Sequence, residues 1–310
     1  MRIKVQSFTR KRAFGIELEM LTSGVTQTQL RNVITKADSK HPVHVTGWQQ
    51  SQGNSYWHVK TDSTCGYEVA SYKAKGAKDV MNIAKIAGAI QSLGAKVDNS
   101  CGLHIHVETT DFNVNEMASL IANWIKMENI ICEAVPVHRA NNIYCKTYST
   151  AIPLKNLENP VSFWTHICPT SFSHEARRKS LNVCNYAFNP GKRTVEFRMP
   201  EGTLDFHEIK NWTRLLVNFV HFIKKVPFPG NVQSANLQQV LQLLGLTCDE
   251  PFLILSAGLH ETKEWFLHRI LRYARSQSLC FEAVAALNKM WEPLKRYEIN
   301  ENCEEYAELT

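Results

Sequence analysis

Three short segments of this chain alternate apolar and ionisable residues, and this pattern limits the possible folds more than any other feature. They read Phe14-Gly-Ile-Glu-Leu-Glu-Met20, Gly102-Leu-His-Ile-His-Val-Glu108 and Arg193-Thr-Val-Glu-Phe-Arg-Met199. Successive side chains of a β-strand point to opposite faces, so each segment would have one apolar and one charged face. If the strands share a sheet, one face is a core and the other gathers carboxylates, imidazoles and a guanidinium.

Other segments predict further strands and the helices that cover the apolar face. Strands are expected at 12–20, 56–60 and 66–71, and a hairpin is expected from 181–188 and 193–199 around Asn189-Pro190-Gly191. Helical spacing of apolar residues predicts helices near 28–37, 80–93, 114–131 and 209–223. Asn113 with Glu116 and Asp205 with Glu208 resemble N-terminal capping pairs. The fold class is therefore α+β, with helices packed on one face of a sheet.

The composition is that of an ordinary globular protein. Of the 310 residues, 44% are hydrophobic and 21% charged. We expect a domain at 1–228 and a helical extension at 229–310 that packs on it or stands apart. The N-terminus lacks the apolar core of a signal peptide, and no apolar run is long enough for a membrane helix. The nine scattered cysteines form no Cys-x-x-Cys pair. We therefore expect a cytoplasmic protein.

Charge is unevenly distributed along the chain. The net charge is +6, but residues 298–310 hold five glutamates and no lysine or arginine, so the rest carries 35 basic against 24 acidic residues, or +11. This balance is compatible with an anionic ligand such as a nucleotide, a phosphate or a nucleic acid, and also with mere solubility. No nucleic-acid-binding motif, Walker loop or dinucleotide fingerprint supports a specific reading.

The charged positions of the three segments have the chemistry of a metal and phosphate site. Glu17 and Glu19 would repel each other unless a cation lies between them, and Mg²⁺ prefers such oxygen ligands. His104 and His106 are compatible with zinc, but the nearby glutamates favour Mg²⁺ or Mn²⁺. Taken alone, each pair is more often an ordinary polar strand face.

Two further groups of residues extend this pattern. Glu196 and Arg198 form either a salt bridge or a metal ligand beside a phosphate clamp, for which a planar guanidinium is suited. Lys60 and Glu68 lie on the expected strands at 56–60 and 66–71. The coincidence of these signals, rather than any one of them, indicates an enzyme.

Taken in order, these motifs resemble the amidoligases of the carboxylate–amine ligase superfamily, which includes glutamine synthetase and glutamate–cysteine ligase. The resemblance rests on Phe14-Gly-Ile-Glu-Leu-Glu, Asp62-Ser with Glu68-Val-Ala-Ser, Cys101-Gly-Leu-His-Ile-His-Val, Ser180-Leu-Asn182, Thr194-Val-Glu-Phe-Arg and Glu201-Gly-Thr-Leu-Asp205. It covers about 12–222 and leaves 231–310 without a matching motif. It implies a curved antiparallel sheet with helices outside, and an ATP-dependent ligase that forms an amide through an acyl phosphate.

The resemblance also implies a role for each matched residue. The implied metal ligands, for Mg²⁺ or Mn²⁺, are Glu17, Glu19, Glu68, His104 and Glu196. Catalytic roles fall to Arg198, Glu196 and His106, and ATP or substrate contacts to Arg198, Lys60, Asn182 and one of Arg178 or Lys179. The partners would be a carboxylate and an amine. Substrate residues would lie in the variable loops at 21–55 and 139–176.

Three rival interpretations stay open at this stage. A phosphotransferase related to the guanidino kinases would use the same kind of sheet but would form no amide. A non-catalytic nucleotide- or metal-binding module is a second alternative, and a nucleic-acid-associated protein is a third. Retention of all the candidate carboxylates and of Arg198 argues against an inactive module.

Overall fold

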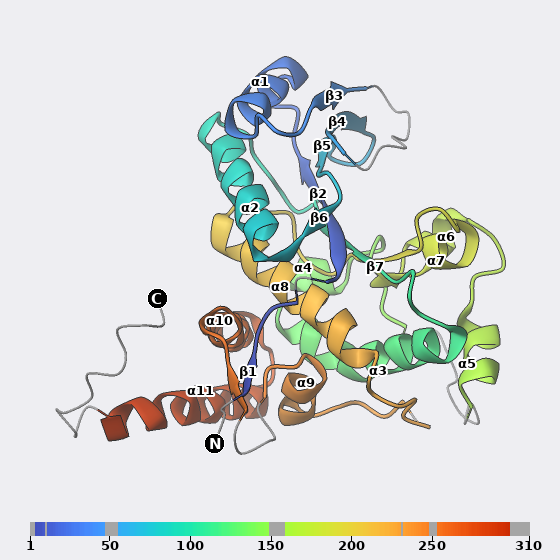
Figure 1. The fold of residues 1–310 in the computed structure, drawn as a ribbon, viewed down its shortest axis with the longest axis vertical. Helices are drawn as coiled ribbons and strands as arrows, with labels where there is room; N and C mark the ends of the chain where they lie inside the picture. The colour runs from blue at the N-terminus through green and yellow to red at the C-terminus, as the bar shows by residue number, and fades with distance from the viewer. Residues whose placement is uncertain are drawn as a thin grey trace.

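An open eight-stranded sheet organises the chain (Figure 1). The structure is a computed structural model and describes residues 4–9, 11–46, 55–148, 159–230, 232–247 and 253–297. The strand order is β3-β4-β5-β2-β7-β9-β8, and β6 pairs with the end of β2. The strands are β2 Ala13–Met20, β3 Val43–Val45, β4 Trp57–Asp62, β5 Gly66–Ala70, β6 Ala74–Lys75, β7 Leu103–Glu108, β8 Leu181–Asn182 and β9 Thr194–Phe197. Within the described chain all pairs of this sheet are antiparallel except β3 with β4, so the sheet is mixed.

The three alternating segments are neighbours, with β7 lying between β2 and β9. Their apolar residues are buried and form one face of the sheet, as the alternation predicts. Helices α2 Gly76–Ser92, α3 Val114–Glu133 and α8 Phe206–Ile223 supply the other side of this core, and α8 contacts β7 directly. The predicted α+β class, with helices outside a sheet, is confirmed.

Local signals place the ends of these helices. Asn113 accepts a hydrogen bond from the Glu116 N–H, and the Glu116 side chain accepts one from the Asn113 N–H, so the predicted capping box is present. Asp205 likewise accepts from the Glu208 N–H at 2.9 Å and begins α8. The first helix, α1 Gln27–Ala37, begins one residue before the predicted segment.

The predicted hairpin at 181–199 is correct only at its base. Strand β8 pairs with β9, but Cys184–Phe188 form helix α7 instead of continuing the strand. The reason is local: the Asn182 side-chain oxygen accepts a hydrogen bond from the Cys184 N–H at 2.9 Å and turns the chain. Three short helices, α4 Val137–Ala140, α5 Pro160–Ile167 and α6 His174–Arg177, precede this turn.

The C-terminal part is mainly helical, as predicted, with α9 Leu237–Leu243, α10 Ala257–Tyr273 and α11 Gln277–Tyr297. Strand β10, Leu253–Leu255, was not predicted, and it pairs in parallel with β1, Lys4–Gln6. Helix α10 packs against α8 (Figure 1). A boundary at 228–229 stays a prediction. The acidic segment 298–310 and parts of the two predicted variable loops, 47–54 and 149–158, lie outside the described residues.

No helix within the described ranges is both long and apolar enough to cross a bilayer.

Candidate functional site

The second face of the sheet gathers the ionisable residues from five strands. In the strand register, Glu17 lies opposite His104, and Glu196 lies opposite both His106 and Asn182. On the other side of β2, Glu19 lies opposite Glu68, which in turn pairs with Lys60. Antiparallel pairing places the side chains of such partners about 5 Å apart. The sequence-predicted metal and catalytic residues therefore come together on one surface.

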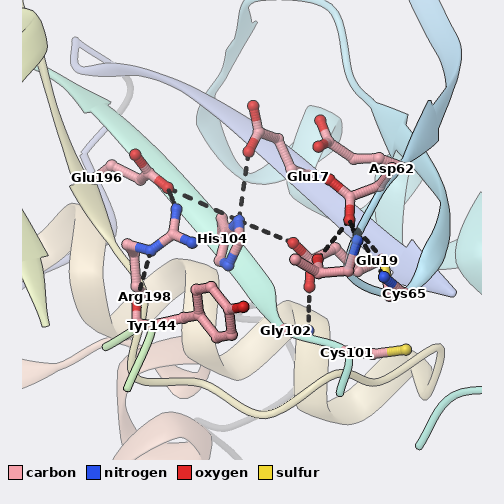
Figure 2. A network of polar contacts seen from close by, with 12 residues as sticks. Glu17, Glu19, Asp62, Cys65, Cys101, Gly102, His104, Tyr144, Glu196 and Arg198 are labelled. Atoms are coloured by element: carbon pink, nitrogen blue, oxygen red, sulfur yellow. Dashed lines mark hydrogen bonds and ion pairs between the residues drawn. The ribbon is translucent and has the colours of Figure 1, made fainter. Parts of the chain in front are cut away.

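His104 stands at the centre of this surface and is buried (Figure 2). Its Nδ1 lies 3.4 Å from Glu17 Oε2, 3.6 Å from Glu19 Oε1 and 3.7 Å from Glu196 Oε1. One ligand atom each from Glu17, His104 and Glu196 lie within 4.8 Å of one another. Two carboxylates and one imidazole at this spacing fit a divalent cation such as Mg²⁺ or Mn²⁺.

Both oxygens of Glu196 are engaged by neighbouring side chains. Asn182 Nδ2 donates to Oε2 at 2.6 Å, and the Arg198 guanidinium contacts Oε1. Burial opposes ionisation of Glu196, but the charges of Arg198 and the two histidines outweigh it and lower its pKa to about 2. Glu196 is thus held as a carboxylate, the form in which it would bind a cation.

Glu17 is held in the same way by the two imidazoles. His106 Nε2 lies 3.3 Å from Glu17 Oε1. Burial works against the charge of Glu17, but His106 and His104 outweigh it and hold its pKa well below the usual value. Burial would lower the pKa of His106, but Glu17 and Glu196 raise it. Glu17 on β2 and His106 on the neighbouring β7 therefore stabilise each other's charged forms.

Glu68 lies on the same face but apart from the group around His104. Its Oε1 pairs with Lys60 Nζ at 2.7 Å. Burial and the nearby charge of Glu17 raise the pKa of Glu68 well above its usual value, while Glu17 and Glu68 together overcome burial and raise the pKa of Lys60. Lys60 and Glu68 therefore contact each other beside the carboxylate of Glu19, and burial works against the charged form of Glu68.

A second group of ligand atoms surrounds Glu19. Atoms of Glu19, Asp62 and Cys65 lie within 4.8 Å of one another, and Glu19 Oε2 accepts a hydrogen bond of 2.6 Å from the Gly102 N–H (Figure 2). Asp62 Oδ1 is already occupied by the turn that follows it, since it accepts from the Thr64 N–H at 2.7 Å. Asp62 belongs to one of the sequence motifs and Cys65 to none, and only the fold shows that both lie close to Glu19.

A cavity of about 350 Å³ opens over this face. One wall is formed by residues of the sheet, including Glu17, Glu19, Glu68 and His104. The other holds cationic and aromatic residues from the segments after α3, which are Arg139, Tyr144, His174, Arg177 and Arg178, while Arg198, directly after β9, also lines the cavity. Arg198 Nε donates to the Tyr144 carbonyl at 2.9 Å, which fixes its guanidinium between the two walls.

The structure separates the remaining predicted residues. Arg178 lines the cavity and lies over the Tyr144 ring at 4.7 Å, whereas Lys179 lies over the Tyr148 ring at 5.5 Å and does not line the cavity. Asn182 is 3% exposed and lies behind Glu196. Arg139 and Tyr144 were missed, because their irregular segment carries no periodic pattern.

A smaller cavity of about 170 Å³ lies on the same sheet face and shares Glu17 with the first. It is lined by His106, Lys73 and Lys192 together with small residues such as Gly15 and Ala70. Two cavities that meet at one metal-ligand candidate suit a reaction between two substrates.

Comparisons with known proteins identify a family. Residues 10–220 match the family described as "Putative amidoligase enzyme". No curated protein matches the chain. A solved structure described as the "Crystal structure of novel glutamine synthase homolog" is similar at 13% identity and a TM-score of 0.38, over 85% of this chain and 65% of that one.

Proposed function

Because the chain belongs to this amidoligase family, we propose that it is a carboxylate–amine ligase that uses ATP and Mg²⁺ or Mn²⁺ to form an amide through an acyl phosphate. The observation that carries the proposal is the group formed by the partly buried Glu17 and the buried His104 and Glu196, which lies beside Arg198 at the edge of a cavity. A carboxylate and an amine would be its substrates.

In the first step, a carboxylate oxygen of the acid attacks the γ-phosphorus of ATP and ADP leaves. Such a transfer depends on positioning and on stabilisation of negative charge more than on a protein nucleophile. Arg198 supplies a fixed guanidinium for the transferring phosphoryl group, because Glu196 and the Tyr144 carbonyl orient it. A cation held by Glu17, His104 and Glu196 would supply charge neutralisation.

In the second step, the amine nitrogen attacks the carbonyl carbon of the acyl phosphate, phosphate leaves and the nitrogen loses a proton. Glu17 borders both cavities, so a reactant in either one reaches the same carboxylate. His106 lies on the wall of the smaller cavity, beside Glu17. We therefore assign His106 a position next to the reacting groups.

The test is nucleotide turnover by the purified protein with Mg²⁺, ATP and fractionated small molecules and peptides, followed by mass spectrometry. A ligase yields ADP, phosphate and a product with the mass of acid plus amine minus water. A product that gains a phosphate would instead identify a phosphotransferase, and AMP would contradict an acyl phosphate.

A matched pair of variants connects the activity with the site. Glu196→Gln removes a charge from the group around His104, whereas Glu282→Gln removes the same charge from an exposed position on α11. We expect turnover to fall by about a hundredfold or more in Glu196→Gln and to be unchanged in Glu282→Gln. Full turnover by Glu196→Gln would contradict the proposed site.

A further inference from the structure

One guanidinium on the wall of the larger cavity is buried without a counter-charge. Arg139, on α4, is 2% exposed. Its Nη2 donates to the Arg198 carbonyl, while its Nε has no hydrogen-bond partner. Within the part of the chain that the structure describes, Arg139 forms no ion pair with a carboxylate. A buried charge without a partner is costly, so this position calls for an anion.

The backbone is shaped to admit this guanidinium next to the metal-ligand candidates. A methyl group placed on Gly102 would lie 2.5 Å from Arg139 Nη2 and 2.8 Å from His104 Nε2. Only a residue without a side chain leaves room for both groups there. An anion bound by Arg139 would therefore lie beside the group in which the proposed phosphoryl transfer occurs.

Two more guanidiniums on the same wall are held by aromatic rings instead of carboxylates. Arg178 lies over the Tyr144 ring at 4.7 Å, and Arg177 lies over the Phe172 ring at 5.4 Å. Neither forms an ion pair with a carboxylate in the described ranges. Glu175, which lies on the same short helix as Arg177, pairs with Lys146 at 3.0 Å. Stacking fixes a guanidinium and leaves its N–H groups available for an anion.

The positive charges of Arg139, Arg177 and Arg178 are more than the transferring phosphoryl group needs for its stabilisation. Arg198 already faces that position, and the carboxylates of the sheet are matched to a cation and to Lys60. The cavity, at about 350 Å³, is near the small end of the range for small-molecule sites. The remaining guanidiniums thus suit a compact ligand with negative charge of its own.

We propose that the acid substrate carries a second anionic group, which the buried guanidinium of Arg139 binds together with Arg178. This inference rests on the proposed ligase function and specifies its substrate class as small dicarboxylic acids or acids of equivalent charge. The reacting carboxylate lies toward Arg198, and the second anionic group lies toward Arg139. Arg139 is then a specificity-determining residue.

Calorimetry without nucleotide tests the inference directly. Succinate and glutarate are compared with succinamate and glutaramate, which have the same length and one charge less, in the presence of Mg²⁺. We expect the dicarboxylates to bind about tenfold to a hundredfold more tightly than their monoamides. Arg139→Gln should abolish this preference, and Arg178→Gln, at a half-buried position, should reduce it if the first variant does not fold. Arg31→Gln, on the exposed face of α1, is the matched control and should keep the preference.

Three results would overturn the inference. They are equal binding of dicarboxylate and monoamide, no binding of either, and an Arg139→Gln variant that loses a non-hydrolysable ATP analogue but keeps the dicarboxylate. The last result would assign Arg139 to a phosphate of the nucleotide.

A second assay separates this inference from the ligase function. With ATP and hydroxylamine, an acyl phosphate is trapped as a hydroxamate. Hydroxamate formed from dicarboxylates but not from monoamides supports both ideas. Equal hydroxamate from both acids keeps the ligase and overturns the inference. Selective dicarboxylate binding without ADP or hydroxamate overturns the ligase and leaves Arg139 as an anion-binding residue.

Discussion

Asn182 and Glu196 face each other across β8 and β9, and the Asn182 amide donates a hydrogen bond of 2.6 Å to Glu196 Oε2. The other end of the same amide accepts from the Cys184 N–H at 2.9 Å, so the side chain is fixed at both ends. This leaves Glu196 Oε1 directed toward His104 and Arg198. Asn182 therefore orients a candidate metal ligand from behind.

Replacing Asn182 should weaken cation binding. We expect Asn182→Ala to lower Mn²⁺ affinity about tenfold to a hundredfold, because a group that orients a metal ligand typically contributes this much. Asn185→Ala is the control, since Asn185 lies on the adjacent helix but donates to Thr194 Oγ1 at 3.3 Å. Calorimetric titration with Mn²⁺ measures both. An unchanged affinity in Asn182→Ala would show that Glu196 does not depend on this contact.

Gly102→Ala should disturb the site more than the fold. The added methyl would meet Arg139 Nη2 and His104 Nε2, both of which would have to move. Gly88→Ala is a matched control, because a methyl there meets nothing within 4 Å and Gly88 lies inside α2, where alanine is favoured by about 0.5–1 kcal/mol. We expect Mn²⁺ affinity to fall at least about tenfold in Gly102→Ala and to be unchanged in Gly88→Ala. Equal affinities would contradict the predicted crowding.

His58 should contribute a pH dependence of stability. Burial, together with the charges of His44, Lys60 and Lys192, lowers its pKa to about 4, and neither ring nitrogen has a hydrogen-bond partner among the described residues. In the unfolded chain the pKa is about 6.5. Because the folded value is the lower one, the stabilising contribution is present above pH 6.5 and is lost as the pH falls toward 4.

The measurement is urea unfolding at pH 7 and pH 5. We expect this one group to lower the free energy of unfolding by about 1–2 kcal/mol between these values in the natural sequence. His58→Phe keeps an aromatic ring beside Tyr56, loses no hydrogen bond and should remove this part of the change. His268→Phe, at an exposed position on α10, should not. Identical changes in all three proteins would contradict a neutral buried His58.

The site strands were predictable because their signal is local. Alternation places Glu17, His104 and Glu196 on the same face of their strands, and this face is determined without knowledge of the partner strand. The prediction that these side chains lie close together needed only one more assumption, namely that the strands share a sheet. The register confirms this proximity, because Glu17 lies opposite His104. The helix N-caps Asn113 and Asp205 were equally predictable, because a capping hydrogen bond joins residues only three positions apart.

Residues that depend on distant contacts were not predictable. Arg139 lies on a four-residue helix in an irregular segment, and its importance comes from Gly102, far away in the sequence. The pairing of β1 with β10 joins residues 4–6 to residues 253–255, and no local pattern specifies a contact between segments so far apart in the sequence. Helix α7 was missed because Asn182 uses its side chain to turn the backbone, in competition with the strand pattern.

Arg269 connects the C-terminal helices to the sheet, and its removal should destabilise the fold. This residue of α10 is 2% exposed, contacts Glu201 and Glu208, and donates from Nε to the Ala134 carbonyl at 2.8 Å. The backbone of Glu201 in turn forms an antiparallel β-bridge with Gly102, the residue before β7. Arg269→Met would leave two carboxylates without their cation, which costs about 3–5 kcal/mol at buried sites.

The control for Arg269→Met is Arg275→Met. Arg275 contacts Glu133 at 2.9 Å from an exposed position, and such pairs contribute less than about 1 kcal/mol. Urea unfolding at pH 7 gives the loss of stability in each variant. Adding Glu201→Gln and Glu208→Gln to Arg269→Met should recover part of the loss, because the uncompensated charges are then removed. Equal losses in the two single variants would mean that the link between α10 and the sheet depends on packing rather than on these charges.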